Sequence, residues 1–244
     1  MIEFLERLTR RRTRHTRPAA VRSTHRTHVG RVRQVNEDRV LDRPERRLWA
    51  VADGMGGHSA GDRAAAAAID ALDALSEPIT APAILRALHA ADRRIAAEAE
   101  RGGSGATIVV AWAEGARLHL FWAGDSRAYR VRDGRAAPLT RDHSLVQELV
   151  DGGVLSEAEA ERHPQANVVT RALGIAATVA IETAECDLAP GDLILLCSDG
   201  LSRSLGPRDF APGLDLGVQA DRLLMNALQR DGSDNASLVL VAVG

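Results

Sequence analysis

One stretch of the sequence indicates the fold most clearly: Leu48-Trp49-Ala50-Val51-Ala52-Asp53-Gly54-Met55-Gly56-Gly57-His58. The first five residues form an unbroken apolar run, which predicts a buried strand, and a carboxylate follows it. Carboxylates stand beside further apolar runs: Asp125 after residues 118–123, Asp199 after 193–197 and Asp234 before 236–243. Because strand ends can aim side chains into a shared site, we expect these aspartates to meet. Carboxylates without cysteine or histidine at ligand spacing predict a site for Mg²⁺ or Mn²⁺ rather than zinc or copper.

A plain turn is the alternative interpretation of Asp53 and Asp199, because Asp-Gly is a common turn dipeptide. The other Asp-Gly pairs fit that interpretation: a hairpin turn at Asp133, and helix ends at Asp151 and Asp231. Asp53 and Asp199 differ because each follows an apolar strand without a matching return strand. The glycine after each also allows its backbone carbonyl to approach a metal closely.

Composition limits the class of protein. The chain has 244 residues, 45% of them hydrophobic, which predicts one domain with a substantial core. All 31 basic residues are arginine, and the absence of lysine excludes a Walker P-loop, a Schiff-base enzyme and a lysine general base. Two cysteines without a spacing pattern favour the reducing cytoplasm. No apolar run approaches the roughly 18 residues of a membrane span.

Charge is concentrated at the start of the chain. Residues 1–33 hold ten arginines against Glu3 and Glu6, so this part is strongly basic while the whole chain carries −2. We expect residues 1–20 to form a disordered basic arm and residues 21–244 to form the domain. Contact with nucleic acid, an anionic membrane or an acidic partner is the alternative for the arm. No nucleic acid is expected, because aromatic interleaving and a nucleic-acid fold motif are missing.

Hydrophobic periodicity predicts the elements. Strands are expected at 21–28, 39–41, 48–52, 106–112, 118–123, 126–131, 179–186, 193–197 and 237–243. Helices are expected at 59–76, 83–101 and 216–230, with a mostly helical insert at 142–173. Strand clusters with hairpin spacing, interrupted by amphipathic helices, predict an α+β fold of antiparallel sheets covered by helices rather than alternating βαβ units.

Six short motifs occur in a recognisable order. They are Gly30-Arg31-Val32-Arg33-Gln34-Val35-Asn36-Glu37-Asp38, Ala52 to His58, Gly124-Asp125-Ser126-Arg127, His163-Pro164 with 167–174, Cys197-Ser198-Asp199-Gly200-Leu201, and Asp234-Asn235. From about residue 21 to 243, the chain resembles the bacterial metal-dependent Ser/Thr protein phosphatases, the PPM family of type 2C. The resemblance implies an α-β-β-α sandwich of two antiparallel sheets flanked by helix pairs, with a helical flap insert at about 142–173.

The resemblance also implies the chemistry. Phosphoserine or phosphothreonine would be hydrolysed by a hydroxide that bridges two Mn²⁺ or Mg²⁺ ions. Asp53 would be the bridging ligand, the Gly54 carbonyl would bind one ion, and Asp199 and Asp234 the other. Glu37 and Asp38 match ligands that act through water, and Asp125 matches the ligand of a weaker third ion.

Arg33 matches the arginine that clamps the substrate phosphate, a task suited to a planar, always-charged side chain. The alternative is one more arginine of a basic N-terminal region.

The chain departs from the family pattern in two places. Met55 stands where many eukaryotic relatives have a histidine general acid. Many bacterial members also have methionine at this position. His58 is the candidate replacement, although it could instead pack or cap the start of a helix, and a metal-bound water could protonate the leaving group. At 104–107 the sequence Ser-Gly-Ala-Thr replaces a more usual Thr-Thr ending, and we expect a packing consequence only.

Partners follow from the same resemblance. We expect phosphorylated proteins as substrates, a cognate bacterial Ser/Thr kinase, and a cytoplasmic monomer. The flap would offer a surface to the substrate protein, or be an ordinary solvated helical face. Two other functions remain open: a metal-dependent phosphatase or phosphodiesterase of small molecules, and a regulatory phosphoprotein-binding module.

Overall fold

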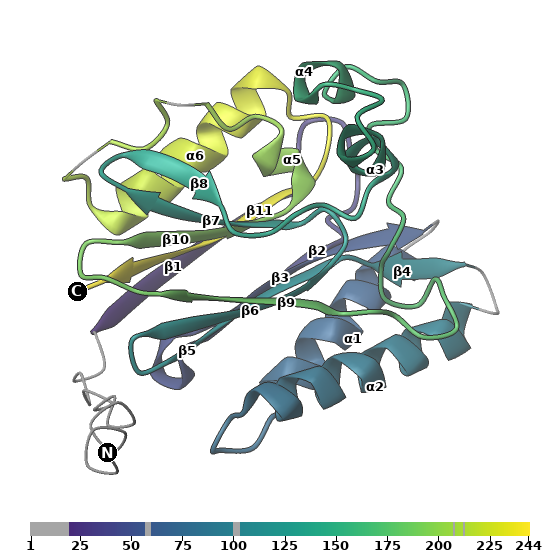
Figure 1. Cartoon of the computed structure of the whole chain (residues 1–244), viewed down its shortest axis with the longest axis horizontal. Coiled ribbons are helices and arrows are strands. Elements are labelled where there is room, and N and C mark those ends of the chain that lie inside the picture. Colours follow the sequence, from purple (N-terminus) through teal and green to yellow (C-terminus); the bar gives the residue numbers. More distant parts are fainter. Residues whose placement is uncertain (1–19, 57–59, 100–102, 207, 212) are drawn as a thin grey trace, which may run out of the picture.

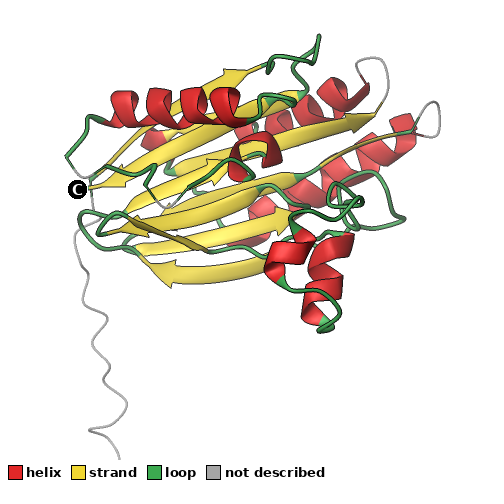
Figure 2. Ribbon diagram, turned by 90° about the horizontal axis from the view of Figure 1, so that it is seen from above, coloured by secondary structure: helices red, strands yellow, loops and turns green. Residues whose placement is uncertain are grey.

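Two antiparallel sheets face each other between layers of helices (Figure 1), as expected. The computed structural model describes residues 20–56, 60–99, 103–206, 208–211 and 213–244. The predicted arm therefore lies outside the described residues, apart from Ala20. Helices α1 (Ala60–Asp73) and α2 (Ala81–Ala99) cover one sheet, while α6 (Leu216–Arg230) and the one-turn α5 (Asp199–Ser202) lie against the other. The view from above shows the same layering (Figure 2).

The first sheet has the strand order β1-β11-β10-β7-β8. These strands are β1 (Val21–His28), β7 (Arg127–Arg132), β8 (Arg135–Pro138), β10 (Leu193–Cys197) and β11 (Ala236–Val243). β1 pairs with β11 along its whole length, from Val21 opposite Val243 to His28 opposite Ala236. The Gly244 N–H donates to the Ala20 carbonyl at 2.7 Å, so the two ends of this described region adjoin.

The second sheet has the order β2-β3-β5-β6-β9, with β4 added to the end of β3. Its strands are β2 (Asp38–Arg43), β3 (Leu48–Gly56), β4 (Ser104–Ala106), β5 (Ile108–Glu114), β6 (Arg117–Ala123) and β9 (Glu182–Asp187). The turn of 3₁₀ helix η1 (Pro44–Arg46) joins β2 to β3. Because side chains alternate along β3, Trp49 and Val51 face the other sheet while Ala50 and Ala52 face the helices.

Three apolar clusters fill the layers. One lies between the sheets and contains Trp49, Val109 and Leu120, a second lies under α1 and α2, and a third lies under α6. Both faces of the central strands are thus buried, which explains why these strands read as continuous apolar runs. No helix of the described residues combines the length and hydropathy needed to cross a bilayer.

The flap is less helical than the sequence predicts. Only α3 (Leu145–Asp151) and the four-residue α4 (Glu157–Ala160) form there, and turns make up most of the rest. The glycine pair after Asp151 ends α3 as expected, with Gly153 at φ 70°. The stems of the flap are tied by bridges between Ser144 and Val169 and between Ala106 and Leu173.

The other predicted elements are found with small shifts. The turn at Asp133 is confirmed, because β7 and β8 pair across it. The strand predicted at 179–186 begins only at Glu182. The helix at 216–230 and the first strand at 21–28 have the predicted bounds. A short helix at Asp199 was not expected, since four residues are too few for a periodic pattern.

Candidate metal centre and phosphate site

The carboxylates meet at one end of the sandwich, between the two sheets. Asp38 and Asp53 are direct partners in the β2–β3 pair. By the alternation of β3, Asp53 points to the same side as Val51, toward the other sheet. Asp53 is not at the strand's end, because β3 continues to Gly56 by pairing with β4. Its Asp-Gly pair is therefore part of a strand and not a turn.

The first sheet supplies three further carboxylates. Asp199 begins α5 just beyond β10, Asp234 lies before β11, and Asp125 lies in the turn between β6 and β7. Burial, and then repulsion from Asp38, Asp199, Asp125 and Asp234 in that order, raise the pKa of Asp53 well above its usual value. The predicted carboxylates are therefore close enough to oppose one another's ionisation.

Burial also raises the pKa values of the carboxyl groups near Asp53. Burial is the main reason that the pKa of Asp38 and that of Asp125 are each raised to about 7. For Asp38, hydrogen bonds from Ser237 and Ser198 partly offset this rise. The pKa of Asp199 is also raised, mainly by burial, although the nearby Arg203 lowers it. The site thus gathers carboxylates whose charge Arg203 and Arg33 neutralise only in part.

Two carboxylate oxygens are left without partners. Ser198 Oγ donates to Asp38 Oδ2 at 2.8 Å, and Arg203 pairs with Asp199 Oδ2. The second oxygens, Asp38 Oδ1 and Asp199 Oδ1, are buried and accept no hydrogen bond. Buried unpaired carboxylate oxygens are costly, and a divalent cation with oxygen ligands would satisfy them. The residues present therefore fit Mn²⁺ or Mg²⁺, although among the described residues no three His, Cys, Asp or Glu side chains form a ready-made metal-binding group.

Gly54 stands where no other residue fits. A Cβ at this position would lie 2.1 Å from the Gly61 carbonyl oxygen and 2.9 Å from the Glu37 carbonyl oxygen. The Gly54 N–H also donates to the Glu37 carbonyl at 3.2 Å. The start of α1 and the loop before β2 thus pack directly on the backbone of β3. A Cβ on Gly61 would lie 2.8 Å from Glu37 Oε1, which places the Glu37 carboxylate beside the start of α1.

Arg33 reaches the cluster from the loop between β1 and β2. Its Nη2 lies 2.8 Å from Asp234 Oδ2, and its side chain is 53% exposed. The hydrogen bond to Asp234 is the main cause that raises the pKa of Arg33, with smaller contributions from Glu37 and Asp53. An exposed, always-charged fork beside the carboxylates can bind an anion. The candidate acid His58 lies outside the described residues.

Thr107 supports the backbone of Asp53, a role that the sequence did not reveal. Its N–H donates to the Asp53 carbonyl at 2.8 Å, and its Oγ1 accepts from the Asp53 N–H at 3.3 Å. Thr107 Oγ1 also shares a hydrogen bond with Ser126 Oγ at 2.7 Å. The expected packing consequence at 104–107 concerns Ala106, which is fully buried. The retained Thr107 has a different role, because it fixes the backbone that carries Asp53. The motif position of Ser126, next to Asp125, was the available signal.

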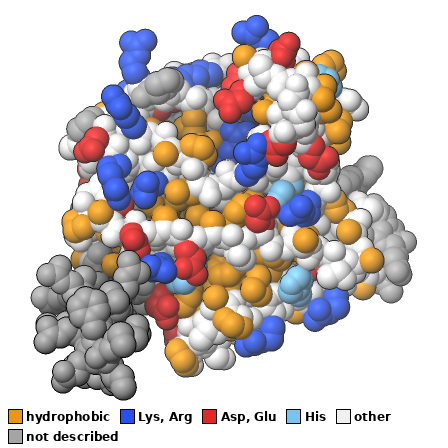
Figure 3. Space-filling view, in the orientation of Figure 1, with side chains coloured by type: hydrophobic (Ala, Val, Ile, Leu, Met, Phe, Trp, Pro, Cys, Tyr) orange, Lys and Arg blue, Asp and Glu red, His pale blue; other side chains and the backbone are white. Residues whose placement is uncertain are grey.

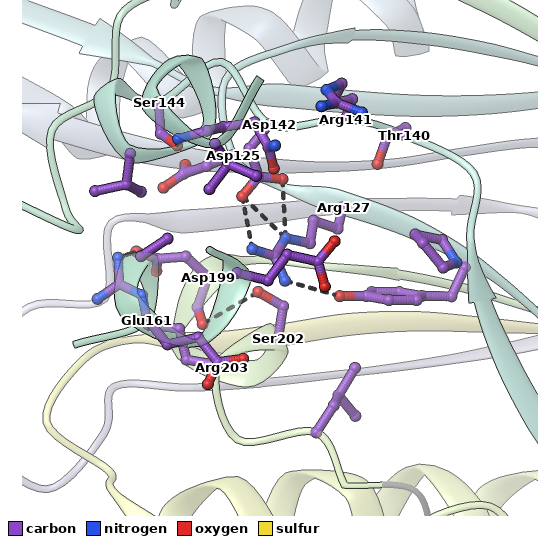
Figure 4. Close-up of a pocket in the computed structure, with 18 of the residues that line it drawn as sticks. Asp125, Arg127, Thr140, Arg141, Asp142, Ser144, Glu161, Asp199, Ser202 and Arg203 are labelled. Atoms are coloured by element: carbon purple, nitrogen blue, oxygen red, sulfur yellow. Dashed lines mark hydrogen bonds and ion pairs between the residues drawn. The ribbon is translucent and has the colours of Figure 1, made fainter. Parts of the chain in front are cut away.

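A cleft of about 1400 Å³ runs from the carboxylates beneath the flap. Asp125 and Asp199 line it, together with Val146 of α3 and Glu161 after α4. Blue arginine atoms lie in the hollow beside the protruding flap (Figure 3). Figure 4 shows the guanidinium of Arg127 directed at Asp142, with Nε–Oδ1 and Nη2–Oδ2 distances of 2.8 and 2.6 Å. Sequence reasoning assigned no role to Arg127, although it closes the Gly124-Asp125-Ser126-Arg127 motif.

Comparison with known proteins agrees with this geometry. The sequence profile of the Protein phosphatase 2C family matches residues 26–222. The chain is 38% identical over 237 residues to the serine/threonine protein phosphatase PstP of Mycobacterium tuberculosis, covering 91% of this chain and 45% of PstP. It is 34% identical over 235 residues to the serine/threonine phosphatase stp of Listeria welshimeri, covering 88% of this chain and 93% of that protein.

One of the similar solved structures contains metal ions. The catalytic domain of PstP in complex with two manganese ions superimposes with a TM-score of 0.81 at 34% identity, covering 91% of this chain and 98% of that domain. The chain thus spans about half the length of full PstP, but nearly the whole of its catalytic domain.

Proposed function

Because the chain belongs to the Protein phosphatase 2C family, we propose that it is a metal-dependent enzyme that removes phosphate from phosphoserine and phosphothreonine in proteins. The buried, unpartnered oxygens Asp38 Oδ1 and Asp199 Oδ1 support this function most directly. They belong to a cluster whose carboxyl pKa values are raised by burial and mutual repulsion. Divalent cations would relieve both costs.

We assign the ligands as follows. Asp53 would be shared by two ions, the Gly54 carbonyl would hold one of them, and Asp199 and Asp234 would hold the other. Glu37 and Asp38 act through water, and Asp125 holds a weaker third ion. When bound, Mn²⁺ or Mg²⁺ activates a water nucleophile and neutralises charge on the phosphoryl group.

The remaining roles belong to side chains of the site. Arg33 binds phosphate oxygens through its guanidinium, since it is exposed and stands beside Asp234. Thr107 keeps Asp53 oriented through both backbone bonds. His58 stays our candidate for the acid that protonates the leaving oxygen, with a water as the alternative.

The substrate test uses a phosphothreonine peptide with and without added Mn²⁺, after a strong chelator has removed bound metal. We expect no turnover in the chelator and recovery on adding Mn²⁺ or Mg²⁺, because oxygen ligands bind such ions reversibly. Full activity after verified metal removal would overturn the binuclear centre. Turnover of p-nitrophenyl phosphate without turnover of any phosphopeptide would favour a small-molecule phosphatase.

The biological setting is also a proposal. A bacterial Ser/Thr kinase would supply the phosphoproteins that this enzyme consumes. Residues 21–244 would form the phosphatase domain, with the flap at 142–173 and the basic arm at 1–20. The free cysteines Cys186 and Cys197 agree with a reducing cytoplasm. We expect a monomer, which light scattering of the purified protein would test.

A further inference from the structure

Asn235 ties together both ends of the segment 29–37, which leaves β1 and enters β2. Its Nδ2 donates to the carbonyl of Val29 at 2.9 Å and to that of Val35 at 3.0 Å. Its Oδ1 accepts from the Glu37 N–H at 2.8 Å. Only this orientation of the amide satisfies all three partners, because flipping it would set donor against donor. Asn235 is 6% exposed, so these bonds have little competition from water.

The tied segment carries Arg33. Residues 29–37 form neither helix nor strand, and Val32 is 71% exposed, so few contacts fix the path of this backbone. Asn235 is also the chain neighbour of Asp234, whose Oδ1 accepts the Asn235 N–H at 2.9 Å. The side chain of Asn235 thus holds the segment that carries Arg33, while its backbone N–H bonds to Asp234, the partner of Arg33. The backbone bond would remain in Asn235→Ala.

Two other hydrogen bonds hold the start of the segment. The Gly30 N–H donates to His28 Nδ1 at 2.9 Å, and the Arg31 N–H donates to the Gly232 carbonyl at 2.7 Å. Both bonds lie at the start of the segment, before Arg33. At its far end, Asn235 bonds to Val35 and Glu37. Further bonds also hold this end: Asn36 Nδ2 donates to Thr27 Oγ1 at 2.7 Å, and the Gly54 N–H donates to the Glu37 carbonyl at 3.2 Å. The bond from Asn235 to Val35 is the nearest of these in sequence to Arg33.

We propose that Asn235 is a positioning residue for substrate phosphate. It holds segment 29–37 so that the Arg33 guanidinium stands over the metal-site carboxylates, and it acts through Arg33 without touching the phosphate. This inference rests on the proposed phosphatase function, because that function gives Arg33 a phosphate to bind. It predicts a defect in substrate binding rather than in the chemical step.

The test is a double-mutant cycle on phosphothreonine-peptide hydrolysis in saturating Mn²⁺. Asn235→Ala should raise KM about tenfold and leave kcat within about threefold. The double variant Asn235→Ala with Arg33→Ala should have the KM of Arg33→Ala alone, because a displaced arginine and a missing one fail in the same way. The proposal would be overturned if the two substitutions raised KM independently, so that their factors multiplied in the double variant. An unchanged KM in Asn235→Ala would also overturn it.

A control variant separates positioning of Arg33 from the general loss of a hydrogen-bonded amide. Asn226 on α6 is half-buried and donates Nδ2 to Asp209 Oδ1 at 2.9 Å, and not to the segment that carries Arg33. Asn226→Ala should leave KM unchanged whatever it does to thermal stability. The affinity of Asn235→Ala for Mn²⁺, measured by calorimetry, should stay within about threefold of the wild-type value. A loss of Mn²⁺ affinity equal to that of Asp234→Asn would assign Asn235 to the metal site instead.

Hydrogen exchange tests the tether without any activity. In the wild-type protein the Glu37 amide should exchange slowly despite its place in a loop, because it donates to the buried Asn235 Oδ1. Fast exchange there would overturn the proposal even if Asn235→Ala fails to fold. If the wild-type protein hydrolyses no phosphopeptide, the proposed function fails, and the tether is judged by this exchange alone.

Discussion

Asp53 lies among four other carboxylates of the site. Burial and the charges of Asp38, Asp199, Asp125 and Asp234 all raise its pKa. Its backbone N–H and carbonyl are both bonded to Thr107, which fixes the direction in which the side chain leaves β3. The repulsion therefore persists in the folded protein until cations offset it.

Asp53→Asn and Asp199→Asn should each abolish most phosphopeptide turnover while leaving the protein folded. The exchange keeps the size of the side chain but removes the charge that holds the cations. The matched control is Asp133→Asn, which changes the same Asp-Gly dipeptide in the β7–β8 turn, where φ is 53° and asparagine is tolerated. Circular dichroism and kcat of the three variants check this; near wild-type turnover would reduce Asp53 or Asp199 to a structural residue.

Arg33→Ala should raise KM for a phosphopeptide by about ten- to a hundredfold with a smaller effect on kcat. The phosphate oxygens are charged in both the ground state and the transition state, so the lost binding is nearly uniform. Arg31→Ala, two residues away, is the control and should change KM little. An unchanged KM in Arg33→Ala, or the same defect after removal of residues 1–20, would end the assignment of Arg33 as the clamp.

At the scale of elements, the flap depends on its stems. His143 lies where the flap begins: its N–H donates to the Gly124 carbonyl at 3.0 Å, and its Nδ1 accepts the Gly124 N–H at 3.1 Å. The Thr170 N–H at the other stem donates to the His143 carbonyl at 2.8 Å. Beside it, Arg127 of β7 binds the Asp142 carboxylate. The flap is thus attached to the turn that carries Asp125.

Asp142→Asn should loosen the flap, because it removes the charge that binds the half-buried Arg127. We expect a loss of about 1–3 kcal/mol in unfolding free energy and faster proteolysis within 142–173. Asp151→Asn is the control, since Asp151 pairs with Arg141 at the exposed surface, where ion pairs contribute about 0–1 kcal/mol. Equal proteolysis rates in the two variants would contradict a special role for the Arg127–Asp142 pair.

The elements differ in how well their sequence predicted them. The strands buried on both faces read as apolar runs, and α6 has an apolar stripe, so periodicity located them within a few residues. The flap was overestimated because its turns contain helix formers without a core to cover. β4 and α5 were missed because each is held by neighbours: β4 by β3, and α5 by its place after β10. The contacts of Asn235 and Thr107 join distant segments, which no local pattern encodes.

At the scale of the whole molecule, the metal site links stability to pH. Asp38 and Asp125 bind protons more tightly in the folded chain, where each pKa is about 7, than in the unfolded chain, where the usual value is 3.8. In the metal-free protein, their proton binding contributes fully to the free energy of unfolding when the pH is below the unfolded-state pKa. This contribution is lost as the pH rises through about 7. Ionisation of these carboxyl groups therefore lowers the free energy of unfolding until cations bind.

Mn²⁺ should therefore raise the Tm more at about pH 8 than at about pH 5, because at the lower pH protons already occupy the carboxylates. Thermal unfolding of chelated and Mn²⁺-loaded protein at both pH values measures the difference. Asp53→Asn should reduce the Mn²⁺-dependent gain at the higher pH. A gain independent of pH would contradict the coupled carboxylate cluster.

The hydrogen bond between Gly244 and Ala20 has a practical consequence for engineering. Because these two residues adjoin, at the end of the sandwich away from the flap (Figure 1), a short linker could join them and the chain could begin elsewhere. Opening it between the exposed Ser76 and Glu77, in the connection from α1 to α2, would leave both sheets intact. Such a circular permutant should keep its Mn²⁺-dependent turnover, which a phosphopeptide assay would measure. The same adjacency would let the whole domain be inserted as a cassette into a loop of a host protein.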